Sequence, residues 1–339
     1  MGSGDTPVAK EPFVPSVLFF KRLIAATLAF IILTLTVLSI VTGVKLRRTR
    51  DRLGEYVAAE EARLAEEEAE RLRNAIPPEK EKPANERDAM DILSEQRIVA
   101  HALGEVDGIA GLNCLEGFRE NYDAGVRVFE ADFRMTSDGY VVLRHDWRRG
   151  WQPNISEKQI PTLEQFRDTP INRKYTPLSF GDLLLLMEQY EDICIVTDSK
   201  FVDAEVVTAQ LEAMLNEARR LGRSYLLDRM IVQVYSQLHY KVVDNLHHFP
   251  HYIYTLYQDG FTGTEEGLRE RLEFVRERGI EGLTLEESVW RPEWMELAEE
   301  AGVKVFVYTV NDAARAKELL EGGVSAIYTD RIKPAELEE

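Results

Sequence analysis

Two histidines, three carboxylates and a lysine stand at or just after the ends of short apolar segments in separate parts of the chain. They are His101, Glu130, Asp132, His145, Asp198 and Lys200. Each segment is rich in β-branched or aromatic residues, a composition typical of buried strands. Polar groups at the C-terminal ends of such strands indicate an active site on an α/β barrel. The residue types suit acid–base chemistry assisted by a metal ion.

The three carboxylates predict a cation site. Residues i and i+2 lie on the same face of a strand, so Glu130 and Asp132 should point into one site. Buried together, they would repel each other and raise their pKa values unless a cation lay between them. With Asp198 from another strand, the ligands are all oxygens, which suit Mg²⁺ or Ca²⁺. A Glu-x-Asp pair also occurs at exposed strand ends, so the pair alone does not establish metal binding.

His101 and His145 are the candidates for proton transfer. Cleavage of a phosphodiester by an internal nucleophile needs one group that takes a proton and another that gives one. Imidazole does both near pH 7, although the sequence leaves open which histidine is acid and which is base. Lys200 would meet a phosphate oxygen as a point charge, and Tyr308 would line the substrate rim. Core histidines, a core tyrosine and a plain Asp198–Lys200 ion pair are the alternatives.

Four further histidines are interpreted as surface or core residues without carboxylate partners: His239, His247, His248 and His251. The formal net charge of −18 argues against a nucleic-acid partner, because a phosphate backbone needs a basic surface. An anionic substrate must therefore be met by a local cation. The two cysteines cannot form a disulfide framework, and Cys194 within an apolar run is interpreted as a core residue.

Strand-like and helix-like segments alternate from residue 97 onward, which predicts βα units and a parallel sheet. The predicted strands are 97–101, 126–130, 140–145, 193–198, 230–234, 252–256, 280–285, 303–309 and 325–329. They favour a TIM-type (β/α)8 barrel, although the prediction contains one strand more than the eight that such a barrel holds. A turn signal at 136–139 replaces a helix there, so we expect the surplus strand at that hairpin or at the C-terminus. A doubly wound open sheet is less favoured, since no glycine-rich loop follows the first strand.

The N-terminal part of the chain predicts a membrane anchor. The run 23–44 is uncharged and basic residues flank it, and about 20 such residues span a bilayer. A cleaved signal peptide, the alternative, would be shorter and end in small residues. We therefore expect a single-pass membrane protein that contacts the lipid bilayer through 23–44, with its orientation open. The predicted segments are an N-terminal tail (1–20), a transmembrane anchor (21–48), a charged helical linker (49–96) and the barrel (97–339).

The order of the motifs resembles the glycerophosphodiester phosphodiesterase family, TIM-barrel enzymes of the wider phosphatidylinositol-phospholipase-C-like superfamily. Matching pieces run from residue 97 to residue 331 and include 113–118, Asn-Cys-Leu-Glu-Gly-Phe, and 323–330, Gly-Val-Ser-Ala-Ile-Tyr-Thr-Asp. The resemblance implies a divalent-metal hydrolase that releases glycerol 3-phosphate and an alcohol through a cyclic intermediate. It also implies the site roles: His101 and His145 in catalysis, Glu130, Asp132 and Asp198 on the metal, and Lys200 on phosphate.

Two departures from the family pattern leave alternatives open. Ala102 stands where the family has arginine, and Asp198 stands where it has glutamate. Both departures are similar to the spider-venom sphingomyelinase D branch, so a phospholyase that acts on lysophospholipids or sphingolipids and yields a cyclic phosphate is the second hypothesis. A degenerate barrel that serves as a membrane-tethered binding module is the third. Retention of every predicted histidine and carboxylate favours an enzyme.

Overall fold

The structure is a computed structural model that describes residues 17–42, 54–60, 62–64, 77–148 and 159–338. The chain divides into two compact units, residues 1–76 and 77–339. The first contains α1 (Val17–Thr42) and helical residues 54–60 and 62–64. These helical residues fall within the predicted charged helix. The rest of that predicted helix up to residue 75, and residues 43–48 of the predicted anchor, lie outside the described residues.

The predicted membrane anchor is wrong. Among the described residues, no helix is long and apolar enough to cross a bilayer. Helix α1 takes in Lys21 and Arg22 near its beginning and ends at Thr42, before the uncharged run of the sequence does. Threonine hydroxyls also recur along it, each donating to the carbonyl four residues earlier. The predicted single-pass location and the bilayer contact through 23–44 are corrected accordingly.

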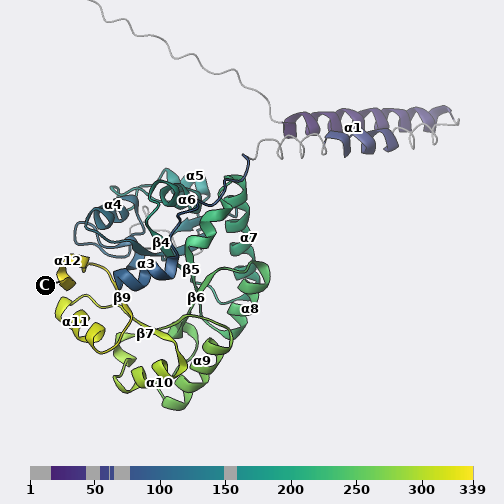
Figure 1. The fold of residues 1–339 in the computed structure, drawn as a ribbon. Coiled ribbons are helices and arrows are strands. Elements are labelled where there is room, and N and C mark those ends of the chain that lie inside the picture. The colour runs from purple at the N-terminus through teal and green to yellow at the C-terminus, as the bar shows by residue number, and fades with distance from the viewer. Residues whose placement is uncertain (1–16, 43–53, 61, 65–76, 149–158, 339) are drawn as a thin grey trace, which may run out of the picture. The chain divides into compact units, whose positions relative to one another are not determined.

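Eight parallel strands close into a barrel, which confirms the predicted (β/α)8 architecture (Figure 1). The sheet closes where β1 pairs with β2, with Ala100 opposite Phe129. Successive strands are otherwise neighbours around the barrel. The eight strands are β1 (Ile98–Ala100), β2 (Val128–Met135), β4 (Cys194–Asp198), β5 (Met230–Val234), β6 (His251–Thr255), β7 (Gly282–Glu286), β8 (Lys304–Tyr308) and β9 (Ala326–Thr329).

The surplus strand lies at the hairpin, one of its two predicted places. Strand β3 (Val141–Leu143) pairs antiparallel with the end of β2, with Phe133 opposite Leu143. The turn is held by Thr136, whose hydroxyl accepts a hydrogen bond from the amide of Tyr140 at 2.9 Å. Strand β2 therefore extends beyond the barrel, and the chain returns to its rim without a helix.

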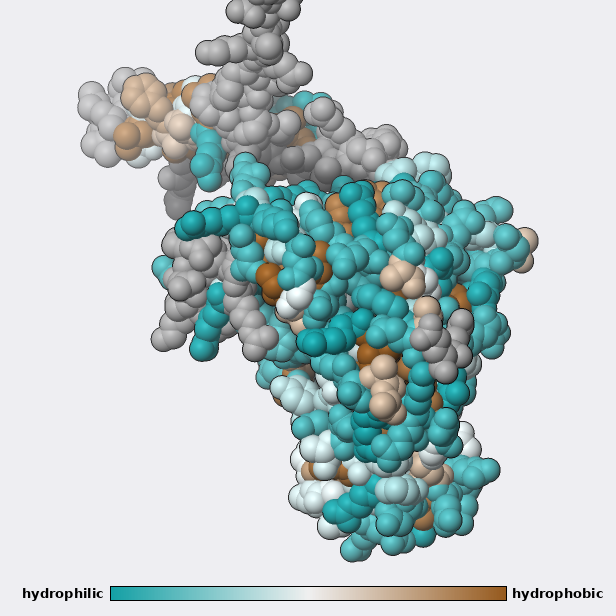
Figure 2. Space-filling view, turned by 90° about the vertical axis from the view of Figure 1, so that its left-hand side faces the viewer, coloured by the Kyte–Doolittle hydropathy of each residue, from teal (hydrophilic) through white to brown (hydrophobic). Residues whose placement is uncertain are grey.

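Helices surround the strands (Figure 1). Their N-termini follow ordinary capping rules, as at α6, where Ser179 and Asp182 form a capping box. They are α4 (Leu115–Asp123), α5 (Leu163–Arg167), α6 (Phe180–Gln189), α7 (Ala204–Arg220), α8 (Gln237–Leu246), α9 (Glu265–Glu277), α10 (Glu293–Ala301), α11 (Ala313–Glu321) and α12 (Pro334–Glu338). Short 3-10 turns are η1 (His101–Leu103), η2 (Ser224–Arg229), η3 (Leu256–Gln258) and η4 (Glu287–Val289). The face shown in Figure 2 is mostly hydrophilic, as the net charge requires.

Apolar side chains of the strands alternate between the barrel interior and the layer beneath the helices. In β4, Val196 belongs to the interior cluster and Ile195 to the outer one. A further helix, α3 (Ala89–Gln96), completes the interior cluster, with Ile92 and Leu93 each 1% exposed. These residues lie within the predicted linker, 49–96. The four-segment division stays a prediction, but α3 packs as part of the barrel unit.

His251 links α3 to the barrel. It has two carboxylate partners, so its interpretation as a histidine without such partners was wrong. Its Nε2 lies 3.0 Å from Oδ2 of Asp88, the N-cap residue of α3, and its Nδ1 lies 2.8 Å from Oε1 of Glu281. Burial alone would lower the pKa of His251, but the hydrogen bond to Glu281 and the charge of Asp88 outweigh it and raise the pKa. His248 likewise pairs with Asp244 at the surface.

We expect His251→Gln to lower the free energy of unfolding by about 1.5–3 kcal/mol at pH 6, the usual contribution of hydrogen bonds to a charged group. Because the folded pKa is raised, this contribution is complete below the unfolded value of about 6.5 and is lost as pH rises through the folded value. Urea unfolding at pH 6 and pH 8 measures it. The exposed His248→Gln variant is the control, and an effect of His251→Gln that grew with pH would contradict the prediction.

Candidate active site

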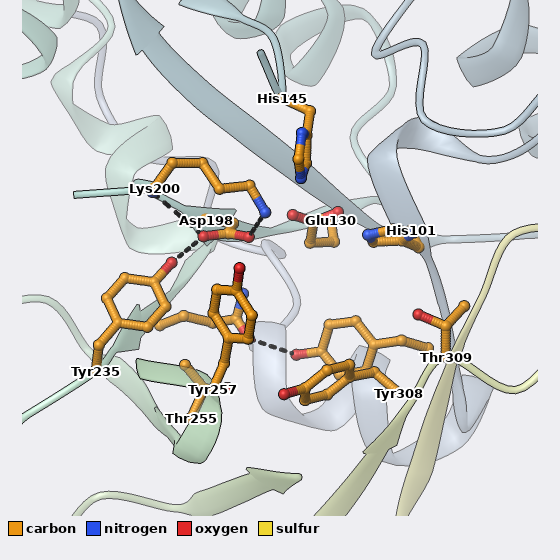
Figure 3. Close-up of a pocket in the computed structure, with 12 residues that line it drawn as sticks. His101, Glu130, His145, Asp198, Lys200, Tyr235, Thr255, Tyr257, Tyr308 and Thr309 are labelled. Carbon is orange, nitrogen blue, oxygen red and sulfur yellow. Dashed lines mark hydrogen bonds and ion pairs between the residues drawn. The ribbon is translucent and has the colours of Figure 1, made fainter. Parts of the chain in front are cut away.

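The predicted site residues meet in a pocket of about 200 Å³ at the C-terminal ends of the strands (Figure 3). All of them line it except Asp132, which is fully buried and touches the pocket residue Lys200. The lining residues are His101, Glu130, His145, Asp198, Lys200, Gln233, Tyr235, Thr255, Tyr257, Tyr308, Thr309 and Tyr328. Parallel strands present their carboxyl ends at one edge, which explains how such distant residues converge.

The three carboxylates form one buried cluster. Glu130 and Asp132 share a face of β2, and Asp132 lies opposite Asp198 in the register of β2 with β4. One oxygen from each of the three lies within 4.8 Å of the others, close enough to hold a metal ion. The exposed fractions are 1%, 0% and 9% for Glu130, Asp132 and Asp198. The chain therefore has a buried acidic triad that could bind a metal.

Hydrogen bonds to neutral groups occupy one oxygen of Glu130 and one oxygen of Asp132, and the other oxygen of each carboxylate remains for a cation. The amide of Ala102 donates to Oε2 of Glu130 at 2.6 Å, and Nδ2 of Asn113 donates to Oδ2 of Asp132 at 2.6 Å. Within the described residues, Oε1 of Glu130 has no hydrogen-bond partner and Oδ1 of Asp132 meets only the ammonium of Lys200. A buried polar atom without a partner needs an explanation, and a bound cation supplies one. The donor set thus fits a hard divalent ion.

Charge repulsion inside the carboxylate cluster also indicates that the site needs a bound cation. Burial, followed by the charge of Asp132, raises the pKa of Glu130 to about 8. Burial also opposes ionisation of Asp132, but Lys200 and His101 hold the pKa of that carboxyl below its ordinary value. The site therefore does not carry its full negative charge unless a further cation is present.

Lys200 follows β4 and Tyr235 follows β5, and both residues contact the carboxylate cluster. The Lys200 ammonium lies 2.7 Å from Oδ1 of Asp132 and also pairs with Asp198. Burial would lower the pKa of Lys200, but the two aspartates raise it well above the ordinary value. Tyr235 donates a hydrogen bond from its hydroxyl to Asp198. A fixed positive charge thus stands beside the pocket, as binding of a phosphate group requires.

Both imidazoles point toward Glu130 in Figure 3. His101 begins η1 after β1, and its Nδ1 lies 2.8 Å from Oδ1 of Asp330. Burial would lower the pKa of His101, but the Asp330 bond and the charge of Glu130 outweigh it and raise the pKa to about 9. His145 follows β3, and its Nδ1 lies 3.1 Å from Oδ2 of Asp146. Each ring is therefore oriented by a carboxylate and faces the pocket.

Two residues that support the site were missed by sequence analysis. Asn113 has φ 52° just before α4, and besides donating to Asp132 it accepts a hydrogen bond from the Asp132 amide at 3.0 Å. Asp330 follows β9, and its Oδ2 accepts from Nδ2 of Asn311 at 2.6 Å. Both lie in quoted family motifs, but their pairings join residues far apart in sequence.

Asp330→Asn is expected to lower kcat by about 10–100-fold, the usual effect of removing a partner that orients a site residue. The amide keeps the shape of the side chain but loses the charge that raises the pKa of His101. The limb of the pH–rate profile that reports His101 should therefore move to lower pH. A lower kcat with an unchanged pH profile would contradict the prediction that the charge of Asp330 raises the pKa of His101.

Comparison with known proteins agrees with this geometry. The model of the glycerophosphoryl diester phosphodiesterase family matches residues 111–333, well over half of the chain. Structural neighbours include a phosphodiesterase from Oleispira antarctica in complex with sn-glycerol-3-phosphate, 18% identical with a TM-score of 0.58, covering 71% of this chain and 94% of that one.

A glycerophosphodiester phosphodiesterase from Parabacteroides distasonis is 19% identical with a TM-score of 0.56, and again 71% of this chain and 94% of that chain are covered. At these identities the neighbours show the fold. The search of curated proteins finds no match. The family match, however, confirms the resemblance drawn from the motifs. The chain belongs to the glycerophosphoryl diester phosphodiesterase family and is thus a phosphoric diester hydrolase.

Proposed function

We propose that this chain hydrolyses glycerophosphodiesters to glycerol 3-phosphate and an alcohol with a divalent metal ion and two histidines. The observation that carries the proposal is one pocket where the carboxylates Glu130 and Asp198 stand beside His101, His145 and Lys200. The Oleispira neighbour, solved with glycerol 3-phosphate, supports the substrate class. Metal sites of oxygen ligands beside imidazoles suit cleavage of phosphate esters.

Glu130, Asp132 and Asp198 would hold Mg²⁺ or Ca²⁺. When bound, the ion supplies positive charge for the phosphate oxygens. It would also compensate the two aspartates that the Lys200 ammonium contacts, which frees that ammonium to meet a phosphate oxygen. Tyr308, on the opposite wall of the pocket, would contact the substrate. The ion and Lys200 would thus stabilise a dianionic transition state although the chain as a whole is negatively charged.

The two imidazoles would carry the protons. In the first step the free glycerol hydroxyl attacks phosphorus, one histidine takes its proton, and the other gives a proton to the departing alcohol oxygen. An oxygen–phosphorus bond forms within a cyclic phosphodiester as the bond to the alcohol breaks. In the second step water opens the ring and the two histidines exchange roles. Asp330 and Asp146 keep the rings oriented in both steps.

The test uses the purified full-length chain with glycerophosphocholine and phosphorus NMR. We expect glycerol 3-phosphate to accumulate with Mg²⁺ or Ca²⁺, to stop with EDTA and to resume when the ion is restored. A cyclic phosphate as the final product would support the phospholyase alternative instead. Absence of both turnover and divalent-ion binding would support a binding module and overturn the proposal.

A further inference from the structure

The pocket has a second wall whose residues transfer no proton and hold no metal ion in the proposed reaction. Opposite the charged residues, Figure 3 shows tyrosines and threonines, and Gln233 and Tyr328 complete the uncharged part of the lining. The tyrosines are Tyr235, Tyr257, Tyr308 and Tyr328. None of the lining residues that the structure describes on this wall is a lysine, arginine, aspartate or glutamate. A substrate arm that leaves the phosphate would therefore meet aromatic rings.

The hydroxyls of two of the four tyrosines donate hydrogen bonds to other side chains of the protein. Tyr235 donates to Asp198, and Tyr328 donates to Oε1 of Gln233 at 3.2 Å. The hydroxyls of Tyr257 and Tyr308 make no hydrogen bond to any described residue. Tyr257 is 62% exposed in η3, and Tyr308 is half-buried at the end of β8. These two rings are available to a ligand at the mouth of the pocket.

The electrostatic surroundings of this wall favour a cation. Burial, followed by the negative charge of Glu286, raises the pKa of Tyr308 well above its ordinary value. The ammonium of Lys200 lies on the other wall, where it contacts two aspartates. An anionic head group would meet further negative charge here, whereas a positive one would be attracted to the ring faces.

We propose that Tyr257 and Tyr308 select substrates whose alcohol carries a quaternary ammonium group. Such a cation has no N–H groups to satisfy, so it loses no hydrogen bonds against aromatic rings, whereas a primary ammonium would. The inference rests on the proposed function and adds the class of alcohol to it. Tyr257, at the exposed edge, would cover the cation, and Tyr308 would form the floor.

The experiment compares kcat/KM for glycerophosphocholine with that for its neutral carbon isostere, the 3,3-dimethylbutyl ester of glycerol 3-phosphate. The two alcohols have the same shape and differ only in charge. We expect the full-length chain to prefer the choline ester about tenfold, the size of a partly desolvated cation–π contact. Tyr257→Leu should bring the ratio close to one, and Tyr257→Phe should keep it. Tyr140→Leu, which alters an exposed tyrosine outside the pocket, should leave the ratio unchanged.

Equal kcat/KM values for the two esters in the unaltered chain would overturn the inference while leaving the proposed hydrolysis intact. A ratio that falls as much in Tyr257→Phe as in Tyr257→Leu would assign the preference to the hydroxyl and would also overturn it. Cleavage of neither ester with Mg²⁺ or Ca²⁺ would overturn the proposed function itself, and this inference with it.

Discussion

His145→Ala is expected to lower kcat for glycerophosphodiester cleavage by about 10²–10⁴-fold, the range that general acid–base groups contribute. The His145 ring points toward Glu130, as the His101 ring does, so alanine removes one of the two proposed proton-transferring groups. His145 is not part of the carboxylate triad, and the affinity for the divalent ion should therefore change little. Steady-state kinetics at saturating metal and substrate measures kcat, and calorimetry measures ion binding.

His248→Ala is the matched control for this variant. His248 also pairs with an aspartate, Asp244, but its side chain is 78% exposed and lies outside the pocket. It should retain the full rate. The acid–base assignment would be abandoned if His145→Ala retained the rate of the unaltered chain while EDTA still stopped the reaction.

Asp132→Asn should lower the affinity for Mg²⁺ or Ca²⁺ by at least about 10²-fold and reduce kcat accordingly. The substitution keeps the size of a fully buried side chain and removes one negative charge from the triad. A unit charge about 4 Å from another is worth about 4 kcal/mol at an effective dielectric constant of 20, which sets the scale of the loss. Titration calorimetry on the full-length chain gives the affinity directly.

Asp123→Asn removes the same charge from an exposed position at the end of α4 and should bind the ion like the unaltered chain. A folded Asp132→Asn protein that bound the ion with unchanged affinity would show that the triad is not the metal site. Circular dichroism establishes folding independently of the binding measurement.

Local patterns predicted the barrel and half of the residues that line the pocket. The strands of a parallel barrel are short buried runs with polar groups at one end, so composition locates both the strand and the site residue that follows it. The spacing of Glu130 and Asp132 fixed their common face, because side chains alternate strictly along a strand. The turn signal at 136–139 likewise made the hairpin one of two predicted places for the surplus strand, and β3 lies there.

Other features depend on contacts between segments that are distant in sequence. Asn113 and Asp330 look like an ordinary residue before a helix and an ordinary residue after a strand, and only folding brings them to Asp132 and His101. Helix α3 was missed because eight residues with a weak apolar pattern resemble a linker until they cover the barrel interior. His251 was dismissed for the same reason, since both carboxylates come from other elements.

The membrane anchor was predicted from composition alone, and among the described residues no helix has the length and apolar character it requires. The sequence by itself predicted the strands, the candidate carboxylates and histidines and the enzyme family, because these depend on short-range periodicity and motif order. Only the tertiary structure decided which oxygens face one another in the carboxylate cluster, which residues orient the imidazoles and which tyrosines form the second wall. Those features are distances between side chains, and a distance between remote residues is fixed only when the barrel closes.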